Sequence, residues 1–357
     1  MRAEELDYEL PADRIATHPA QPRDAARLMV VYRAEDRVEH HRVRDLPRLG
    51  LLTPGDLMVV NQTRVLPAAV EAKRVRTGGR VKGLYLRTDE AGHWLMLLES
   101  RGVLAPGEII ELDERTRLTL MERVEGGQWR ARYEGSEPAG AVLARLGRTP
   151  LPPYIQKARR AQHEPAIGPE DAQQYNTVYA RDAGSAAAPT AGLHFTPALL
   201  EALDRVGVGR AALTLHVGPG TFAPIRAQEL AQHVMHEEWF HVPAPVIEAI
   251  QQIRAEGRRI MAVGTTTVRA LESLPEPVEP WPQGYTAATR LFIHPDAGFR
   301  FRFTDMLLTN FHLPRSTLLA LVASLPGVRL DRLKRWYRLA IEEGYRFYSY
   351  GDAMLLV

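Results

Sequence analysis

Residues 94–133 read WLMLLESRGVLAPGEIIELDERTRLTLMERVEGGQWRARY, and this stretch indicates how the chain is divided. Pairs of turn-forming residues, such as Pro106-Gly107 and Gly126-Gly127, separate short runs of β-forming residues. These runs are Trp94–Ser100, Glu108–Leu112, Arg117–Val124 and Gln128–Tyr133. Because the runs are short and no helical pattern lies between them, they predict closely spaced β-strands.

The same pattern begins earlier, with runs at Val65–Val75 and Arg80–Arg87. Six closely spaced strands predict a small barrel or a sandwich. A short helix is expected at Glu137–Leu146, and the proline-rich segment Pro150–Ile155 is expected to be a rigid linker. We therefore predict a β domain of residues 64–149 that is inserted into a larger domain of residues 1–63 and 150–357.

Outside the predicted insertion, apolar runs typical of strands alternate with helical patterns. The expected strands are Arg27–Arg33, Val38–Val43, Leu57–Val60, Ala211–Val217 and Arg259–Val263. The expected helices are 196–207, Pro245–Glu256, Val268–Ser273, Ser316–Ser324 and Leu330–Glu343. Thr196-Pro197 is a typical helix start, in which threonine caps and proline takes the first helical position. The alternation predicts an α/β fold with a largely parallel sheet that helices cover.

Composition excludes several kinds of chemistry. The chain has 357 residues, no cysteine and a formal net charge of +2. Without cysteine there are no disulfides, catalytic thiolates, cysteine-bound zinc ions or iron–sulfur clusters. The N-terminus lacks an apolar signal segment, and no apolar run approaches the roughly 20 residues of a membrane-spanning helix. We therefore expect a cytoplasmic protein that does not bind a membrane, and any nucleic acid must be bound by local basic patches.

A candidate anion site follows the strand expected at Arg259–Val263. Gly264-Thr265-Thr266-Thr267 leads from this strand into a helix, so backbone amides and threonine hydroxyls are available for a carboxylate or phosphate. The segment is not a Walker motif, because the lysine and the glycine spacing are missing. Ordinary helix capping explains the same residues equally well.

Histidines are the main candidates for acid–base chemistry near pH 7. His194 and His216 are two of them, and HVMHEEWFH (residues 233–241) contains His236 beside Glu238. A divalent metal site is the alternative for this cluster, but its spacing gives no H-E-x-x-H motif. We therefore expect that the histidine cluster holds no metal ion. Instead, we expect neutral imidazoles to act as acid and base.

The segment GSAAAPTAGLHF (residues 184–195) is unusually rich in small residues. Small side chains let a ligand or a neighbouring segment approach the backbone closely. A tightly packed loop, with His194 as a core residue, is the simpler explanation from this segment alone.

Two segments near the C-terminus contain more polar groups than helix capping or core packing requires. TNFHLPRST (residues 309–317) contains Asn310, His312 and Arg315 before an apolar helix, which predicts a ligand-facing loop. YRFYSYGD (residues 345–352) combines aromatic rings with an arginine and could stack an exposed base. Core aromatic packing is the alternative for this second segment.

Basic side chains gather in two places, around Lys73 and Arg74 in the β domain and around Lys157 and Arg160 after the expected linker. Contacts to phosphates are one interpretation of these groups. A solvated charged surface is the other.

Nine motifs, taken together, resemble the S-adenosylmethionine:tRNA ribosyltransferase-isomerase family of queuosine biosynthesis. They are GDLMVVNQTRVLPA, LPPYI, YNTVYA, GSAAAPTAGLHF, LHVGPGTFAPI, HVMHEEW, VGTTTVRALES, TNFHLPRSTLLALVAS and YRFYSYGDAMLL. The resemblance runs from Leu10 to the C-terminus. It implies a two-domain monomer, in which a small six-stranded β-barrel is inserted into an α/β domain.

The resemblance also implies the reaction. S-adenosylmethionine gives its ribosyl group to 7-aminomethyl-7-deazaguanine in the wobble position of tRNA, and the product is epoxyqueuosine with adenine and methionine released. A base must remove a proton from the 5′-carbon beside the sulfonium, and an acid must protonate adenine as it leaves. No cofactor is implied, since S-adenosylmethionine is a substrate.

The matching motifs suggest which residues take part. The catalytic groups are expected among His194, His216, His236, Glu238 and Asp352, with His194 or His216 as the first choice for the base. The expected substrate-binding residues are Thr190, Thr265, Thr266, Thr267, Arg269, Asn310, His312 and Arg315, with the three consecutive threonines on the methionine carboxylate. The expected RNA-binding residues are Arg64, Lys73, Arg74, Lys157 and Arg160.

Some positions depart from the usual pattern of the family. They are Gln62, Ala69, Asn176, Ala186, Glu237 and Asp296. Gln62 and Glu237 make their two positions poor candidates for an obligatory charge or hydroxyl.

Two functions of other classes stay open, a metal-dependent hydrolase built on the histidine cluster and an RNA-binding protein without catalysis. An ordinary methyltransferase is disfavoured, because no Gly-x-Gly-x-Gly turn follows a strand with an acidic residue about 20 positions later.

Overall fold

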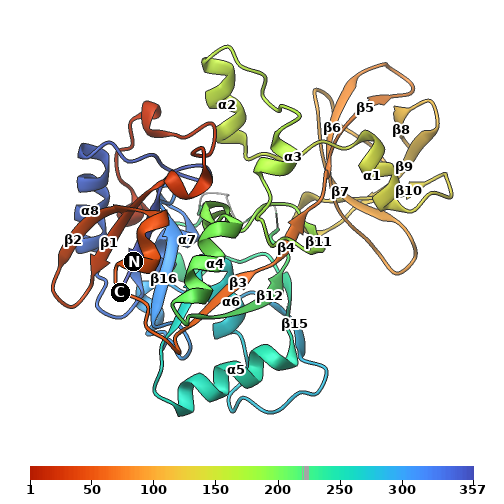
Figure 1. The fold of residues 1–357 in the computed structure, drawn as a ribbon. Helices are drawn as coiled ribbons and strands as arrows, with labels where there is room; N and C mark the ends of the chain where they lie inside the picture. Colours follow the sequence, from red (N-terminus) through yellow and green to blue (C-terminus); the bar gives the residue numbers. More distant parts are fainter. Residues whose placement is uncertain (219, 221–224) are drawn as a thin grey trace.

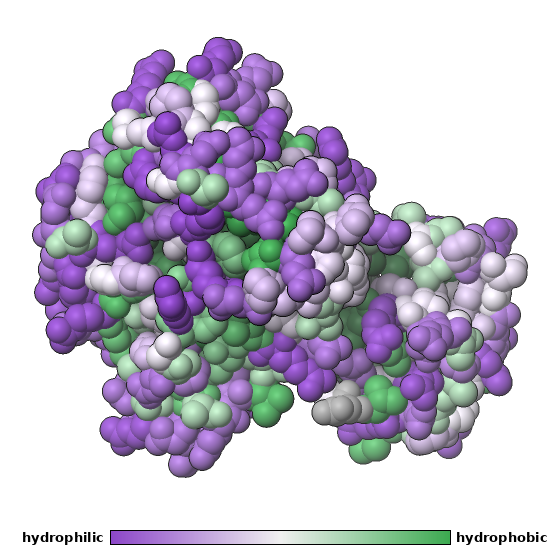
Figure 2. Space-filling model, turned by 90° about the horizontal axis from the view of Figure 1, so that it is seen from below, coloured by the Kyte–Doolittle hydropathy of each residue, from purple (hydrophilic) through white to green (hydrophobic). Residues whose placement is uncertain are grey.

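A computed structural model describes residues 1–218, 220 and 225–357 of the chain. The LHVGPGTFAPI motif (residues 215–225) lies partly outside the described residues, so the expectations for it are followed only at those that are described. Figure 1 shows a larger body, in which helices surround a sheet and both termini lie, with a β-barrel to one side of it. Figure 2 shows the barrel set off from the larger body by a notch, and hydrophilic side chains over most of the visible surface.

Nine strands form the sheet of the larger body within the described part of the chain. In spatial order they are β15 (Tyr285–Thr289), β13 (Glu238–Val242), β12 (Gly209–Leu215), β3 (Leu57–Asn61), β14 (Ile260–Val263), β16 (Met306–Asn310), β17 (Ala353–Leu356), β1 (Arg27–Tyr32) and β2 (Arg37–Arg42).

The strand directions only partly match the expectation of a largely parallel sheet. The central strands β12, β3, β14 and β16 are parallel to their neighbours in this group, and β17 is parallel to β1. The other neighbouring pairs, β15–β13, β13–β12, β16–β17 and β1–β2, are antiparallel. The expectation is correct for the centre of the sheet and wrong for these four pairs.

Helices cover both faces of this sheet. Successive residues of a strand face opposite sides, so Leu57 and Val59 of β3 join one apolar cluster, and Met58 and Val60 join another. The first cluster includes apolar side chains of α5 (Ala244–Ala255), α6 (Thr265–Glu272), α7 (Thr317–Ala323) and α8 (Leu330–Glu342). The second includes those of α4 (Pro197–Arg205).

The stretch with short β runs forms a closed barrel, in the order β10–β7–β6–β5–β8–β9. The strands are β5 (Ala69–Arg74), β6 (Arg80–Thr88), β7 (Trp94–Ser100), β8 (Ile109–Asp113), β9 (Thr116–Arg123) and β10 (Trp129–Tyr133). Trp94 and Trp129 are buried in its core, where Val142 and Leu143 of α1 (Ala139–Leu146) also pack. The barrel beside a mixed α/β body confirms the predicted fold class.

The predicted run Val65–Val75 is divided in the structure. Pro67 has no amide hydrogen and cannot donate to a neighbouring strand. The chain before it forms β4 (Thr63–Val65), which pairs in parallel with β11 (Asp182–Ser185) instead of joining the barrel. This small sheet lies between the larger body and the barrel (Figure 1).

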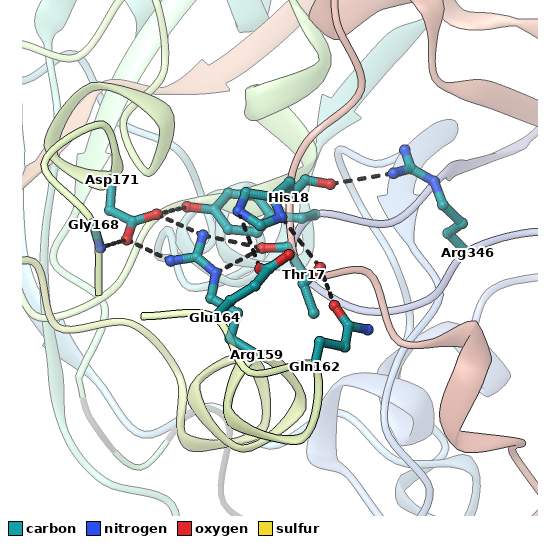
Figure 3. A network of polar contacts seen from close by, with 9 residues as sticks. Thr17, His18, Arg159, Gln162, Glu164, Gly168, Asp171 and Arg346 are labelled. Carbon is teal, nitrogen blue, oxygen red and sulfur yellow. Dashed lines mark hydrogen bonds and ion pairs between the residues drawn. The ribbon is translucent and has the colours of Figure 1, made fainter. Parts of the chain in front are cut away.

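The expected linker Pro150–Ile155 runs into a helix. Proline fits the first helical position, and helix α2 (Pro153–Ala161) begins at Pro153. A second short helix, α3 (Asp171–Gln174), follows it along the chain. Two guanidinium nitrogens of Arg159 lie 2.6 and 2.8 Å from the two carboxylate oxygens of Asp171, and both side chains are buried. Arg159 also donates to the carbonyl oxygen of Thr17 (Figure 3), so this ion pair fastens α2 to α3 and to the N-terminal segment.

Candidate active site

The central parallel strands end at one edge of the sheet, and polar or flexible residues stand at each end. Asn61 ends β3, His216 follows β12, Gly264 follows β14 and Asn310 ends β16. Open α/β sheets bind ligands outside the carboxyl ends of their strands, so this edge is the expected place for a site.

A cleft opens at this edge and has two lobes. The first lobe is lined by residues 188–191, 264–266, 309, 310 and 312. The second lobe shares Thr190, Asn310 and His312 with the first and is also lined by Tyr154, Tyr348 and Ser349. Segments that are far apart in the sequence therefore meet around one cleft.

The small-residue segment forms one wall of the cleft. A short 3₁₀ helix, η6 (Thr190–His194), ends this wall. Thr190 Oγ1 donates to Asn310 Oδ1 at 3.0 Å, and Asn310 Nδ2 donates to the carbonyl oxygen of Tyr348 at 3.0 Å. These bonds join three sequence segments where the two lobes meet.

Two of the three predicted threonines line the cleft. Helix α6 begins at Thr265, three residues earlier than predicted, and Gly264 has a φ of 89°, which favours glycine. Thr265 and Thr266 line the first lobe. Thr267 donates to the carbonyl oxygen of Val263 at 2.7 Å and is not among the lining residues.

Asn61 holds the start of α6 in place; it lies in the quoted motif GDLMVVNQTRVLPA but was not among the predicted site residues. Its Nδ2 donates to the carbonyl oxygen of Leu215 at 2.9 Å and to Thr266 Oγ1 at 3.3 Å. Its Oδ1 accepts from the amides of Thr63 and Leu215, both at 3.1 Å. The Asn61 side chain is buried, so water cannot readily replace these bonds.

His312 is the histidine that lines both lobes. Its Nε2 lies 2.8 Å from Thr309 Oγ1, and its backbone amide donates to the Tyr337 hydroxyl at 3.1 Å. Burial lowers the pKa of His312 to about 3, so the ring is neutral near pH 7. Within the described part of the chain, no group is hydrogen-bonded to Nδ1, which leaves that nitrogen for a ligand.

His194 is held by backbone on both sides of its ring. Nδ1 lies 3.0 Å from the carbonyl oxygen of Ala191, and Nε2 lies 3.0 Å from that of Gly351. The side chain is buried and is not among the residues that line the cleft. Burial lowers the pKa of His194, although both carbonyls favour the charged ring. This placement fastens the wall of the cleft to the chain before β17.

His216 lies beside the cleft, directly before the lining residue Val217. Its Nδ1 lies 2.8 Å from Thr63 Oγ1, and burial lowers its pKa. One side of the ring is close to Gly184, where an added Cβ would lie 2.5 Å from Nε2. The ring also stacks on Trp239, with centroids 4.9 Å apart and planes 20° apart.

Glu238 and Arg269 form a buried ion pair between β13 and α6, outside the residues that line the cleft. Glu238 also accepts from the amide of Gly218 at 2.8 Å, and Arg269 donates to the carbonyl oxygen of Leu291 at 3.1 Å. His236, from the same motif as Glu238, is exposed. The structure therefore places the HVMHEEW motif beside the cleft, with its buried carboxylate in a bracing pair.

Asp352 and Arg315 make contacts away from the cleft lining. Asp352 is buried and accepts from the amides of Arg27 and Arg346, at 2.9 and 2.8 Å. Arg315 forms an ion pair with Asp7 at the surface. These two predicted residues are not brought together with the threonines and His312.

The predicted RNA-binding residues are spread over three elements. The exposed ones are Arg64 on β4, Lys73 on β5, and Lys157 and Arg160 on α2. Arg74 is instead joined to Glu108 in an ion pair on the barrel, and this hydrogen bond raises the pKa of the guanidinium.

The comparisons with known proteins decide the family. A family model described as "Queuosine biosynthesis protein" matches residues 3–356. The chain belongs to this family. It is 46% identical to the S-adenosylmethionine:tRNA ribosyltransferase-isomerase of Rubrobacter xylanophilus, over all of this chain and 98% of that protein. It is 43% identical to the protein of the same name from Moorella thermoacetica, over the whole of both chains.

A solved structure agrees with this family. The crystal structure of S-adenosylmethionine tRNA ribosyltransferase from Thermotoga maritima is 34% identical, covers 99% of this chain and 100% of that chain, and has a TM-score of 0.54. The predicted family is confirmed, and this queuosine biosynthesis protein is an enzyme of that family.

Six of the family-like motifs line the cleft, and a seventh supports it. The lining motifs supply Tyr154, Thr190, Val217, Thr266, His312 and Ser349, and the supporting one supplies Asn61. Tyr154 and Ser349 were not predicted as site residues, and their hydroxyls lie 2.5 Å apart. Both lie in quoted motifs, which was the signal available for finding them.

Two features are absent from the described residues of the chain. No group of three or more histidine, aspartate or glutamate side chains is placed there to hold a metal ion. No described helix has the length and apolar character needed to cross a membrane.

Proposed function

We propose that this enzyme transfers the ribosyl group of S-adenosylmethionine to 7-aminomethyl-7-deazaguanine in the wobble position of tRNA. The group isomerises to give epoxyqueuosine, and adenine and methionine are released. The names of the relatives support this reaction. The observation that carries it for this chain is the meeting of six sequence motifs around one two-lobed cleft at the sheet edge.

The reaction sets clear demands on the cleft. The bonds from the ribosyl group to adenine and to sulfur break, while a bond to the acceptor nitrogen and an epoxide form. Adenine leaves with a proton, methionine leaves as a neutral sulfide, and one proton is released overall because the sulfonium charge is lost. The site must therefore hold a carboxylate, accommodate two planar bases and move protons.

We assign the first lobe to the methionine part of the substrate. The hydroxyls of Thr265 and Thr266, at the N-terminus of α6, supply hydrogen bonds and a favourable dipole for its carboxylate. The second lobe, with the rings of Tyr154 and Tyr348, suits a planar base.

We assign proton transfer to His216 in preference to His194. Both nitrogens of His194 are within hydrogen-bonding distance of carbonyl oxygens, so its role is to position the wall. His312, with a pKa of about 3, is too weak a base near pH 7, and we assign it a neutral hydrogen bond to substrate through Nδ1. His216 has its Nε2 without a hydrogen-bond partner among the described residues.

We further propose that residues 64–149 act as a separate barrel domain and that the protein works as a monomer in the cytoplasm without a metal. The tRNA is the partner, bound through exposed cations that include Lys73, Lys157 and Arg160. Arg74 is left out of this set because Glu108 already neutralises it.

Product release tests the proposed function. The enzyme is incubated with S-adenosylmethionine and tRNA that carries the aminomethyl base, and free adenine and methionine are measured by chromatography. We expect both products in equal amounts, and none with tRNA that lacks the aminomethyl group. Release of S-adenosylhomocysteine in place of adenine would show methyl transfer and overturn the proposal.

A further inference from the structure

Trp239 is a large aromatic residue on the surface, with 42% of its area exposed. It lies on β13 between Glu238 and Phe240, which are buried on the opposite face of the strand. The alternation of strand side chains thus places the indole on the outer face of the sheet edge. The core does not need the indole there, so its position requires another explanation.

The indole is held in a fixed orientation by its neighbour on β12. The backbone amide of His216 donates to the carbonyl oxygen of Trp239 at 2.9 Å, so the two residues lie opposite each other on adjacent strands. The two ring planes are nearly parallel, and their centroids are 4.9 Å apart. This distance matches the usual spacing of about 4.8 Å between neighbouring strands. The ring planes therefore face along the direction from one strand to the next.

The other face of the indole points toward β15, where the paired residue is Ala288. Ala288 is exposed and carries only a methyl group, and its neighbours Thr286 and Arg290 are exposed as well. Among the described residues, the rings in contact with Trp239 are those of His216 and His241. The slot that remains beside the indole has the Ala288 methyl as its floor, and it is flanked by the His241 ring, whose centroid is 6.3 Å from that of the indole.

The indole is linked to the candidate active site through His216, and exposed arginines lie on β4 and directly after β15. Trp239 stacks on His216, which lies beside the cleft and contacts Thr63 at the start of β4. Arg64 on β4 is exposed, and Arg290 is only weakly engaged, since its partner Glu237 lies 3.3 Å away with both side chains mostly in solvent. An aromatic face together with exposed arginines suits single-stranded RNA, whose bases stack and whose phosphates are negative.

We propose that Trp239 is a stacking platform for an unpaired nucleobase of the tRNA, adjacent to the base that reacts. This inference rests on the proposed function and names the contact that guides the RNA into the cleft. The platform reads no base identity, because every nucleobase has a flat face that can stack. His216 ties the platform to the site, so a stacked neighbour and the reacting base are held together.

The test uses an RNA hairpin with the anticodon-loop sequence and 2-aminopurine next to the wobble position. Its fluorescence is quenched when the probe base stacks on an indole. Binding is compared for wild type, Trp239→Ala, Trp239→Phe and the control Val103→Ala, an exposed apolar residue on the barrel side of the chain. Thermal unfolding of each variant is recorded alongside.

We expect Trp239→Ala to raise Kd by about 5- to 100-fold and to lose the quenching, while Trp239→Phe keeps most of the affinity. The slope of log Kd against log salt should not change, because no phosphate contact is removed. Val103→Ala should stay within about twofold of wild type.

Three outcomes would overturn the platform. They are wild-type affinity in a folded Trp239→Ala variant, an unchanged quenching, or an effect on self-association in place of RNA binding. Adenine release by the wild type is measured in parallel. If the wild type binds the hairpin but releases no adenine from the modified tRNA, the proposed function fails and the platform is still judged by binding.

Discussion

Removing the side chain of Asn61 should weaken both the fold and the substrate site. Asn61→Ala leaves the amides of Thr63 and Leu215 and the carbonyl of Leu215 without their partner in a buried place. Each such group costs about 1–3 kcal/mol, so the loss of all three partners should lower the free energy of unfolding by about 3–9 kcal/mol. The variant also removes the bond to Thr266 Oγ1, which lines the first lobe, so affinity for S-adenosylmethionine should fall about tenfold, or about 1.4 kcal/mol.

Urea unfolding and calorimetric titration with S-adenosylmethionine measure the two effects. Gln62→Ala is the matched control, since Gln62 is the next residue and makes one side-chain hydrogen bond, to Asp182 at 3.0 Å, in an exposed position. It should lose less than about 1 kcal/mol and bind the ligand as wild type does. If Asn61→Ala behaves like this control, Asn61 does not anchor the site and the reasoning is refuted.

Other predictions concern charges and histidines. Arg269→Met removes the cation that neutralises the buried carboxylate of Glu238 and should lower the free energy of unfolding in urea by about 3–5 kcal/mol. Adding Glu238→Gln should restore part of this loss, and equal stability of the single and double variants would contradict the reasoning. His312 has a folded pKa of about 3, below its unfolded value, so its contribution to stability is complete above about pH 6.5 and is lost at about 1.4 kcal/mol per pH unit as pH falls toward 3. The stability difference between wild type and His312→Gln should therefore vary over that range, and a constant difference would count against burial as the cause. His194→Gln should lower the free energy of unfolding and keep the pH dependence of turnover. His216→Gln should abolish that pH dependence, and the reverse result would exchange the roles of the two histidines.

The barrel could be predicted from sequence because its signals are local. The runs around Trp94 and Trp129 are short, rich in β-forming residues and bounded by turn residues, and each of these patterns reports on neighbouring residues only. The division at Pro67 was missed, although proline without an amide hydrogen was a visible reason for a strand to end.

The edges of the main sheet were harder to predict. Residues 238–241 were interpreted as part of a histidine cluster, but they belong to strand β13, in which the buried side chains of Glu238, Phe240 and Val242 alternate with Trp239 and His241. Strands β16 and β17 are short and wholly buried, so their residues show no alternation that could separate strand from helix.

Several residues that line the cleft could be chosen from motifs, whereas the contacts that hold the cleft together could not. Thr190, Thr265, Thr266, Asn310 and His312 were chosen from motifs, and the structure brings them to one cleft. The contact between Asn61 and Thr266 joins residues 205 positions apart, and no spacing rule in one sequence reports it. The backbone contacts of His194 have the same origin, since Gly351 is 157 positions away.

The central claim is that S-adenosylmethionine gives its ribosyl group, and it is tested most directly with labelled substrate. The enzyme is incubated with modified tRNA and S-adenosylmethionine that carries carbon-13 throughout the ribosyl group, and the digested nucleosides are analysed by mass spectrometry. The account predicts a wobble nucleoside that contains all the labelled carbons, with unlabelled adenine and methionine in solution. A nucleoside that gains label only when the methyl group is labelled would contradict it.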